Sequence, residues 1–128
     1  MPKLVVRSEN APAPVAAYSQ AVRAGDFLFL SGQIAIDPAT NQLVSGGIEA
    51  ETRRVLDNLT AVLEAGGATR ADVVKITAYL IDMQDFAAFN AVYVSYFPEQ
   101  PPARATVAVT GLPRSVRVEI DAVALVAR

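Results

Sequence analysis

Hydrophobic residues recur along the chain in two periods, and these periods divide it into helices and strands. Between residues 48 and 66 the apolar positions are spaced as on one face of an α-helix. A second helix is predicted over residues 82–97, and Pro98 ends it because proline cannot continue a helix. Both apolar stripes are expected to face a core. They consist of Val55, Leu56, Leu59, Val62 and Leu63 in the first helix, and of Phe86, Phe89, Val92, Tyr93, Tyr96 and Phe97 in the second.

The other apolar runs are short and rich in β-branched residues, which predicts strands. They lie at residues 4–6, 18–23, 27–36, 42–44, 72–81, 103–109 and 116–126, with turn-forming residues between them. This order predicts one two-layer α+β domain over residues 1–128, in which both helices cover one face of a mixed sheet. The second face has no helix to cover it. If that face is as apolar as the sequence suggests, it should pack against other copies of the chain.

Single residues mark where some of these elements end or bend. Gly66 and Gly67 should end the first helix. Asp82 is expected to cap the second helix, with Asp85 close to the positive end of the helix dipole. Gly32 interrupts an apolar strand, which indicates a bulge or the close approach of another group to the backbone.

The last two predicted strands carry the polar residues with the clearest chemistry. Within residues 103–109, Arg104 and Thr106 share one face, and the other, wholly apolar face is expected to be core. If this strand forms a hairpin with residues 116–126, Glu119 lies close to opposite Arg104. An arginine beside a carboxylate suits the recognition of a planar carboxylate and the handling of a water or a proton. The pattern alone favours the alternative, an ordinary ion pair between strands.

Composition narrows the possible chemistry. The 128 residues carry a net charge of −2 without a basic stripe, so the chain lacks the electrostatic footprint of a nucleic-acid-binding protein. Cys and His are absent, which excludes a thiol nucleophile and a Ser-His-Asp triad and argues against zinc, haem and iron–sulfur sites. No apolar run reaches the ~20 residues of a membrane span, and residues 1–7 are too short for a signal peptide. We therefore expect a soluble, cytoplasmic protein.

Six short motifs occur in a characteristic order: Tyr18-Ser19-Gln20-Ala21, Ser31-Gly32-Gln33-Ile34, Asp57-Asn58-Leu59, Phe89-Asn90-Ala91-Val92-Tyr93, Pro102-Ala103-Arg104-Ala105-Thr106-Val107 and Val118-Glu119-Ile120-Asp121-Ala122. Together they resemble the reactive intermediate deaminase family, RidA/YjgF, over essentially the whole chain and without an insertion. The last two motifs form the most specific pair, and the Ser-Gly-Gln-Ile motif supports them.

This resemblance implies a chorismate-mutase-like fold and a homotrimer whose sheets surround a central barrel, with one site in each of three clefts between subunits. It also implies an activity of the 2-iminobutanoate/2-iminopropanoate deaminase type. Such an enzyme hydrolyses reactive enamine and imine intermediates, notably 2-aminoacrylate, to a 2-oxo acid and ammonia. No metal or organic cofactor is expected, and no nucleic-acid or membrane partner.

The resemblance also implies roles for individual residues. Arg104 corresponds to the arginine that grips the substrate carboxylate, and Glu119 to the glutamate that positions the attacking water. The other matching positions help to form the pocket. These are Tyr18, Ser31, Gly32, Asn90 and Thr106. Ala16-Ala17 stands where many members have Gly-Pro, so the loop that carries Tyr18 can sit differently here.

Most of the pocket positions also have a purely structural interpretation. Tyr18 would suit a contact between subunits, where aromatic residues are common, and Ser31 could serve the bulge alone. Asn90 could bond backbone at a helix end or in a loop, and Thr106 is a good strand residue. Arg53-Arg54 is expected to lie on a solvated helix face.

The function has alternatives too. The same cleft would serve a non-catalytic binder of small 2-oxo acids, or an enzyme that acts on a different imine. A ribonuclease, a translation inhibitor and a chaperone-like surface are further possibilities in this family. The acidic charge balance and the missing His argue against the ribonuclease.

Overall fold

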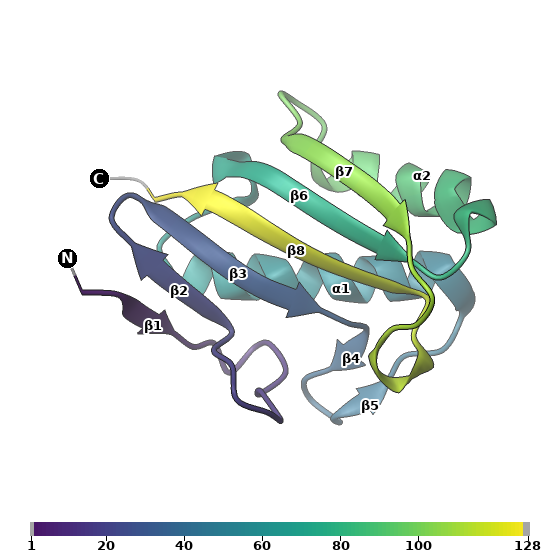
Figure 1. The fold of residues 1–128 in the computed structure, drawn as a ribbon, viewed down its shortest axis with the longest axis horizontal. Coiled ribbons are helices and arrows are strands. Elements are labelled where there is room, and N and C mark those ends of the chain that lie inside the picture. The colour runs from purple at the N-terminus through teal and green to yellow at the C-terminus, as the bar shows by residue number, and fades with distance from the viewer. Residues whose placement is uncertain (1, 127–128) are drawn as a thin grey trace.

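The computed structural model describes residues 2–126, which form a six-stranded mixed sheet with two helices behind it (Figure 1). The sheet contains β1 (Leu4–Val6), β2 (Ala21–Ala24), β3 (Phe27–Gln33), β6 (Val73–Leu80), β7 (Ala103–Ala108) and β8 (Val118–Leu125). The helices are α1 (Gly47–Ala65) and α2 (Phe86–Tyr96), and β4 (Ile36–Asp37) pairs with β5 (Gln42–Leu43). Three 3-10 turns are η1 (Arg70–Asp72), η2 (Met83–Asp85) and η3 (Pro113–Ser115). The predicted two-layer α+β architecture is confirmed.

The sheet order is β1-β2-β3-β8-β6-β7, and the predicted hairpin between the last two strands is wrong. Strand β7 pairs in parallel with β6, which places Arg104 opposite Ile76. Strand β8 lies between β3 and β6, where Glu119 pairs with Tyr79. The reason is the helix α2 between β6 and β7, because a helical crossover joins parallel strands. Strand β7 therefore takes the edge and β8 fills the centre.

The core lies between the sheet and the helices, as the apolar stripes predict. Phe89 is fully buried on α2, and Tyr93 is nearly so. The largest buried side chains of α1 and of the sheet belong to the same core as Phe89 and Tyr93. These include Leu28, Val55, Leu56, Val62, Leu63, Ile76, Leu80, Val118 and Ile120. Strand alternation thus directs every second residue of the sheet into this one layer.

The opposite face of the sheet is uncovered and partly apolar. Strand registers align Val5, Val22, Phe29 and Val123 in one row across four strands. Phe29 is 48% exposed in this row. Val107 of β7 also lies on this side and is exposed, so the prediction that the apolar face of β7 is core is wrong. Its other face turns toward α2 instead.

The helix ends largely follow the sequence. Helix α1 is capped by Gly66, and Gly67 has a φ of 84°, in the left-handed region that favours glycine. The Asp82 side chain accepts a hydrogen bond from the Gln84 backbone N–H at 2.9 Å, so it caps η2, the turn that leads into α2. Asp85 makes no side-chain cap bond. Within residues 2–126, neither helix has the length and hydrophobicity needed to cross a lipid bilayer.

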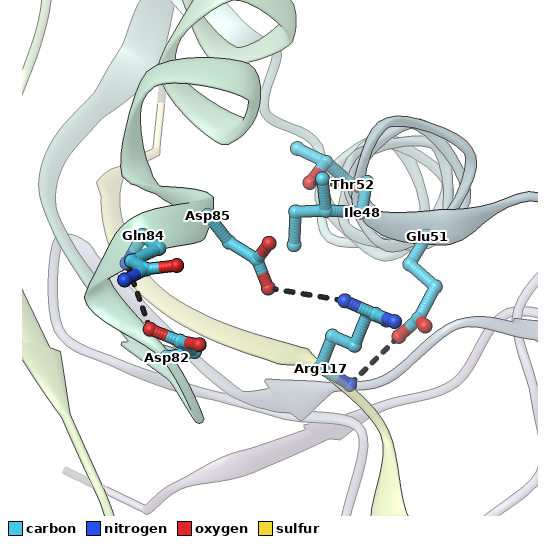
Figure 2. Close-up of polar contacts among 7 residues, drawn as sticks. All are labelled: Ile48, Glu51, Thr52, Asp82, Gln84, Asp85 and Arg117. Atoms are coloured by element: carbon cyan, nitrogen blue, oxygen red, sulfur yellow. Dashed lines mark hydrogen bonds and ion pairs between the residues drawn. The ribbon is translucent and has the colours of Figure 1, made fainter.

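Asp85 instead joins the start of β8 to the start of α2 (Figure 2). Its carboxylate lies 3.5 Å from Arg117 Nη1, and the backbone N–H of Arg117 donates to Glu51 Oε1 of α1 at 2.9 Å. The Arg117 side chain is more than half exposed. Such a pair adds little to stability, since water screens it.

Candidate functional site

A pocket of about 460 Å³ opens where β3 and β8 meet the surrounding loops. Tyr18 reaches it from the loop before β2, and Ser31 and Gly32 from the end of β3. Arg114 lines it from η3 and Glu119 from β8. The structure thus brings four of the predicted site residues into one pocket: Tyr18, Ser31, Gly32 and Glu119.

Gly32 allows the Glu119 carboxylate to lie against the backbone of β3. The pairing of β3 with β8 is interrupted here, so that Ser31 and Gly32 together oppose the single residue Asp121. A Cβ atom at position 32 would overlap a carboxylate oxygen of Glu119. Both features expected of Gly32, a bulge and a close approach, are therefore present.

The environment of Glu119 favours its protonated form. Burial raises the pKa of this carboxyl above its ordinary value of 4.5, and the charge of Asp121 raises the pKa further. A carboxyl whose pKa is raised toward neutrality can accept a proton and return it.

The buried side chain of Gln20 fixes the loop that forms one wall of the pocket. Its Oε1 accepts a hydrogen bond from Ser8 N at 2.6 Å, and its Nε2 donates to Ser8 O at 3.0 Å and to Pro12 O at 2.8 Å. Ser31 Oγ donates to the carbonyl of Ser19 at 2.5 Å. These bonds hold the Tyr-Ser-Gln-Ala motif against the end of β3.

A second brace comes from Asn58, which is fully buried on α1. Its Nδ2 donates to the carbonyls of Ile34 at 3.2 Å and Ile36 at 2.9 Å, in the segment that follows β3 and lines the pocket. Arg54 Nε donates to Asn58 Oδ1 at 3.1 Å. Of the two arginines expected on a solvated helix face, Arg53 is exposed, whereas Arg54 is only partly exposed because its guanidinium supports a buried amide.

Arg104 lies on the other side of the sheet, between β7 and α2. Its Nη1 donates to Asn90 Oδ1 at 2.8 Å. The guanidinium carbon lies 4.6 Å from the centroid of the Tyr93 ring, and Phe86 and Phe89 contribute rings at 5.5 and 5.8 Å. Three rings around one cation fix its position by cation–π attraction. Asn90 thus bonds a side chain, rather than the backbone that its structural interpretation suggested.

Two buried hydroxyls beside Arg104 lack a partner. Among residues 2–126, neither Tyr93 Oη nor Thr106 Oγ1 has a hydrogen-bond partner. Burial raises the pKa of Tyr93, while the nearby Arg104 charge acts in the opposite direction. Both hydroxyls can therefore bond a polar group that enters beside Arg104.

The predicted site residues therefore fall into two groups within one chain. Arg104 and Thr106 face α2, which carries Asn90, whereas Glu119 belongs to the pocket on the far side of the sheet. Strands β7 and β8 are also separated by β6. Arg104 and Glu119 both lie in the described part of the chain, and no ion pair joins them, so the favoured interpretation as an ordinary pair is wrong.

Sequence reasoning gave no role to three residues that form or brace the pocket. Gln20 and Asn58 belong to the motifs of the family resemblance. The position of Asn58 next to the apolar stripe of α1 could have indicated that this amide is buried. Arg114 lies in a turn, where its sequence neighbours gave no sign of the pocket. Its φ of 55° is unusual for a residue other than glycine, and such backbone is enriched at functional sites.

Comparison with known proteins agrees with the motifs and the fold. The sequence pattern of the family described as Endoribonuclease L-PSP matches residues 8–126. The chain belongs to this family, which is the YjgF/RidA family. The resemblance inferred from the six motifs is thereby confirmed.

Relatives in the YjgF/RidA family cover nearly the whole chain. A RutC family protein of Pyrococcus horikoshii is 53% identical over 95% of this chain and 97% of its own length. A mouse protein named 2-iminobutanoate/2-iminopropanoate deaminase is 44% identical over 94% of this chain and 90% of its own. The crystal structure of the YjgF gene product of E. coli has a TM-score of 0.92 at 38% identity, covering 95% of this chain and 98% of that one.

Proposed function

We propose that this protein hydrolyses reactive 2-imino acids, and the enamines that form them, to 2-oxo acids and ammonia. The observation that carries the proposal is the half-buried Glu119 carboxyl, whose pKa is raised, in the wall of a pocket. A suitable substrate is small and carries a carboxylate beside a C=N bond. The name of the mouse relative states an activity of this type for that protein.

In this proposal Arg104 anchors the substrate. A guanidinium has five N–H donors, and the hydrogen bond to Asn90 uses one of them. A bidentate contact with the substrate carboxylate would fix the position of the imine carbon. The rings of α2 hold the guanidinium ready for this contact, and Thr106 Oγ1 can donate to the same ligand.

Glu119 would transfer the proton that hydrolysis requires. The oxygen of a water adds to the imine carbon while the carboxylate of Glu119 accepts the proton that leaves this water. Glu119 then returns this proton to the nitrogen of the adduct that the protonated imine has formed, and takes up the proton of the new hydroxyl. The C–N bond breaks, ammonia departs, and the C=O bond of the 2-oxo acid forms. Such imines already hydrolyse in water unaided, so one oriented carboxyl is an adequate catalyst.

The positions of Arg104 and Glu119 favour a site that is shared between two copies of the chain. The two residues face opposite sides of the sheet, so one substrate cannot reach both within a single chain. We therefore propose a homotrimer in which Arg104, Asn90 and Thr106 of one chain complete the pocket of the next. The apolar row across the uncovered face supports this assembly, because a second copy would bury it.

The test is a coupled assay in which a dehydratase generates 2-aminoacrylate and the release of pyruvate is followed. Semicarbazide competes for the imine in the same reaction. Wild type should accelerate pyruvate release, and Arg104→Ala should lower kcat/KM by a factor on the order of 10² to 10³, because the substrate charge loses its partner. Arg117→Ala, which removes an exposed arginine, is the matched control and should remain close to wild type.

Two outcomes would contradict the proposal. Full activity of Arg104→Ala would refute the anchor. If wild type binds 2-oxo acids tightly but never accelerates pyruvate release, then the protein is a binder or acts on a different imine.

A further inference from the structure

A second carboxylate lies on the same side of the sheet as Glu119. Residues alternate along β8, so that Val118, Ile120 and Ala122 are buried toward the helices while Glu119 and Asp121 face the uncovered side. Two residues along a strand are separated by about 6.6 Å. The proposed reaction makes no use of Asp121.

Tyr79 holds Asp121 in place from the neighbouring strand. The Cα of Tyr79 is paired directly with that of Glu119, yet its hydroxyl donates to Asp121 Oδ2 at 2.9 Å. The phenol therefore reaches diagonally across the pair of strands to the carboxylate of Asp121. The hydrogen bond to Asp121, and then burial, raise the pKa of Tyr79 above 10.0, so the phenol keeps its proton and remains a donor.

Other charged and titratable groups near Glu119 come from the surrounding elements. Arg114 of η3 and Tyr18 of the loop before β2 line the same pocket. Lys75 of β6 pairs with Val123, farther along the uncovered face. Asp121 is the neighbour whose charge acts on Glu119, in addition to the effect of burial.

We propose that Asp121, held by Tyr79, is a positioning residue that controls the proton carried by Glu119. The negative charge of Asp121 opposes ionisation of the neighbouring carboxyl, since like charges at this separation repel. If other copies of the chain cover this face, the repulsion becomes stronger because less water screens it. The electrostatic coupling between the two carboxyls does not depend on the proposed function. Only the use of this proton in catalysis rests on that function.

The decisive experiment follows the carboxyl carbon of Glu119 by ¹³C NMR during a pH titration of the full-length protein. Glutamate labelled at this carbon provides the signal, and Glu119→Gln assigns it by its loss. In Asp121→Asn the midpoint for Glu119 should move to lower pH. This variant has the shape of wild type and can still accept the Tyr79 hydrogen bond. Asp121→Glu, which restores the charge, should return the midpoint toward that of wild type.

Tyr79→Phe tests the anchor separately. This variant keeps the charge of Asp121 but removes the hydrogen bond that holds the Asp121 side chain. The titration midpoint of Glu119 should therefore move to lower pH, by less than in Asp121→Asn. A midpoint in Asp121→Asn equal to that of wild type would overturn the proposal. An unchanged midpoint in Tyr79→Phe would overturn the role of Tyr79.

The pH dependence of imine hydrolysis then connects this coupling to the reaction. The acid limb of kcat/KM should move to lower pH in Asp121→Asn, in step with the NMR midpoint. If the midpoint moves but the acid limb does not, Asp121 has no role in the reaction. If wild type hydrolyses no imine while the midpoint still moves, the proposed function fails and the carboxyl coupling stands.

Discussion

Glu119 and Arg104 show how the surroundings of a single residue decide its chemistry. Arg104 is enclosed by three rings and an amide of α2, which keep its guanidinium in one place. Glu119 lies against a glycine, and a Cβ atom at this position would displace the carboxylate from its place. The cost of burying this charge appears as its raised pKa. That cost should be measurable as a dependence of stability on pH.

We expect Glu119→Gln to be more stable than wild type at pH 7 to 8, and to lose this advantage as the pH falls below about 4.5. The pKa of Glu119 is higher in the folded chain than in the unfolded one, so the folded state binds more protons between the two values. Wild-type stability therefore falls as the pH rises through this window. Urea unfolding of both proteins at one concentration and several pH values measures the difference. A difference that is the same at all pH values would show that Glu119 is not perturbed by folding.

The sequence predicts which segments form helices and strands more directly than it predicts which strands pair with each other. The two periods of hydrophobic residues predicted both helices and the strands, because burial of one face imposes the period. They did not predict that β8 lies between β3 and β6, since a strand pattern does not specify its partner. The hairpin expected between the strands of Arg104 and Glu119 failed for this reason.

The candidate site was predictable to a similar degree. The motifs selected residues that do line the pocket or surround Arg104, but the division into two groups required the strand order. The braces Gln20 and Asn58 could not be derived from pattern alone. Their partners are backbone carbonyls and N–H groups whose positions exist only in the folded chain.

The Asn58 brace leads to a prediction about the pocket wall. Asn58→Ala should lower the free energy of unfolding by about 2–4 kcal/mol, because two carbonyls, one buried and one partly buried, lose their donor. Glu64→Ala, at an exposed position of the same helix, should change it by less than about 0.5 kcal/mol. Denaturant unfolding gives both values, and hydrogen exchange should become faster near residues 34–36 in Asn58→Ala alone. Equal stability of the two variants would show that the brace is dispensable.

At the scale of the whole molecule, a single chain does not explain why one face of the sheet is apolar and yet uncovered. Its apolar row spans four strands, whereas the opposite face is covered by both helices (Figure 1). Apolar surface of this kind is usually buried by a partner. In the proposed trimer the partner is another copy of the chain, and the same contact would bring the two halves of the site together.

Phe29→Glu should therefore convert the proposed trimer to monomers, because burying an unpaired carboxylate at an interface costs several kcal/mol. Val94→Glu is the control. Val94 is 53% exposed, close to the 48% of Phe29, but it lies on α2 and not on the uncovered face of the sheet. Sedimentation velocity at micromolar concentration distinguishes the two states. A trimer of Phe29→Glu would place the interface elsewhere.

The central claim, that one site uses Arg104 from one chain and Glu119 from another, is tested most directly by mixing two inactive variants. Arg104→Ala and Glu119→Gln are unfolded together in equal amounts, refolded and assayed for imine hydrolysis. In randomly assembled trimers about a quarter of the sites contain both native residues, so the mixture should recover about a quarter of wild-type activity. If each site were built within one chain, no trimer would contain a native site. Activity of the mixture no higher than that of the separate variants would contradict the account.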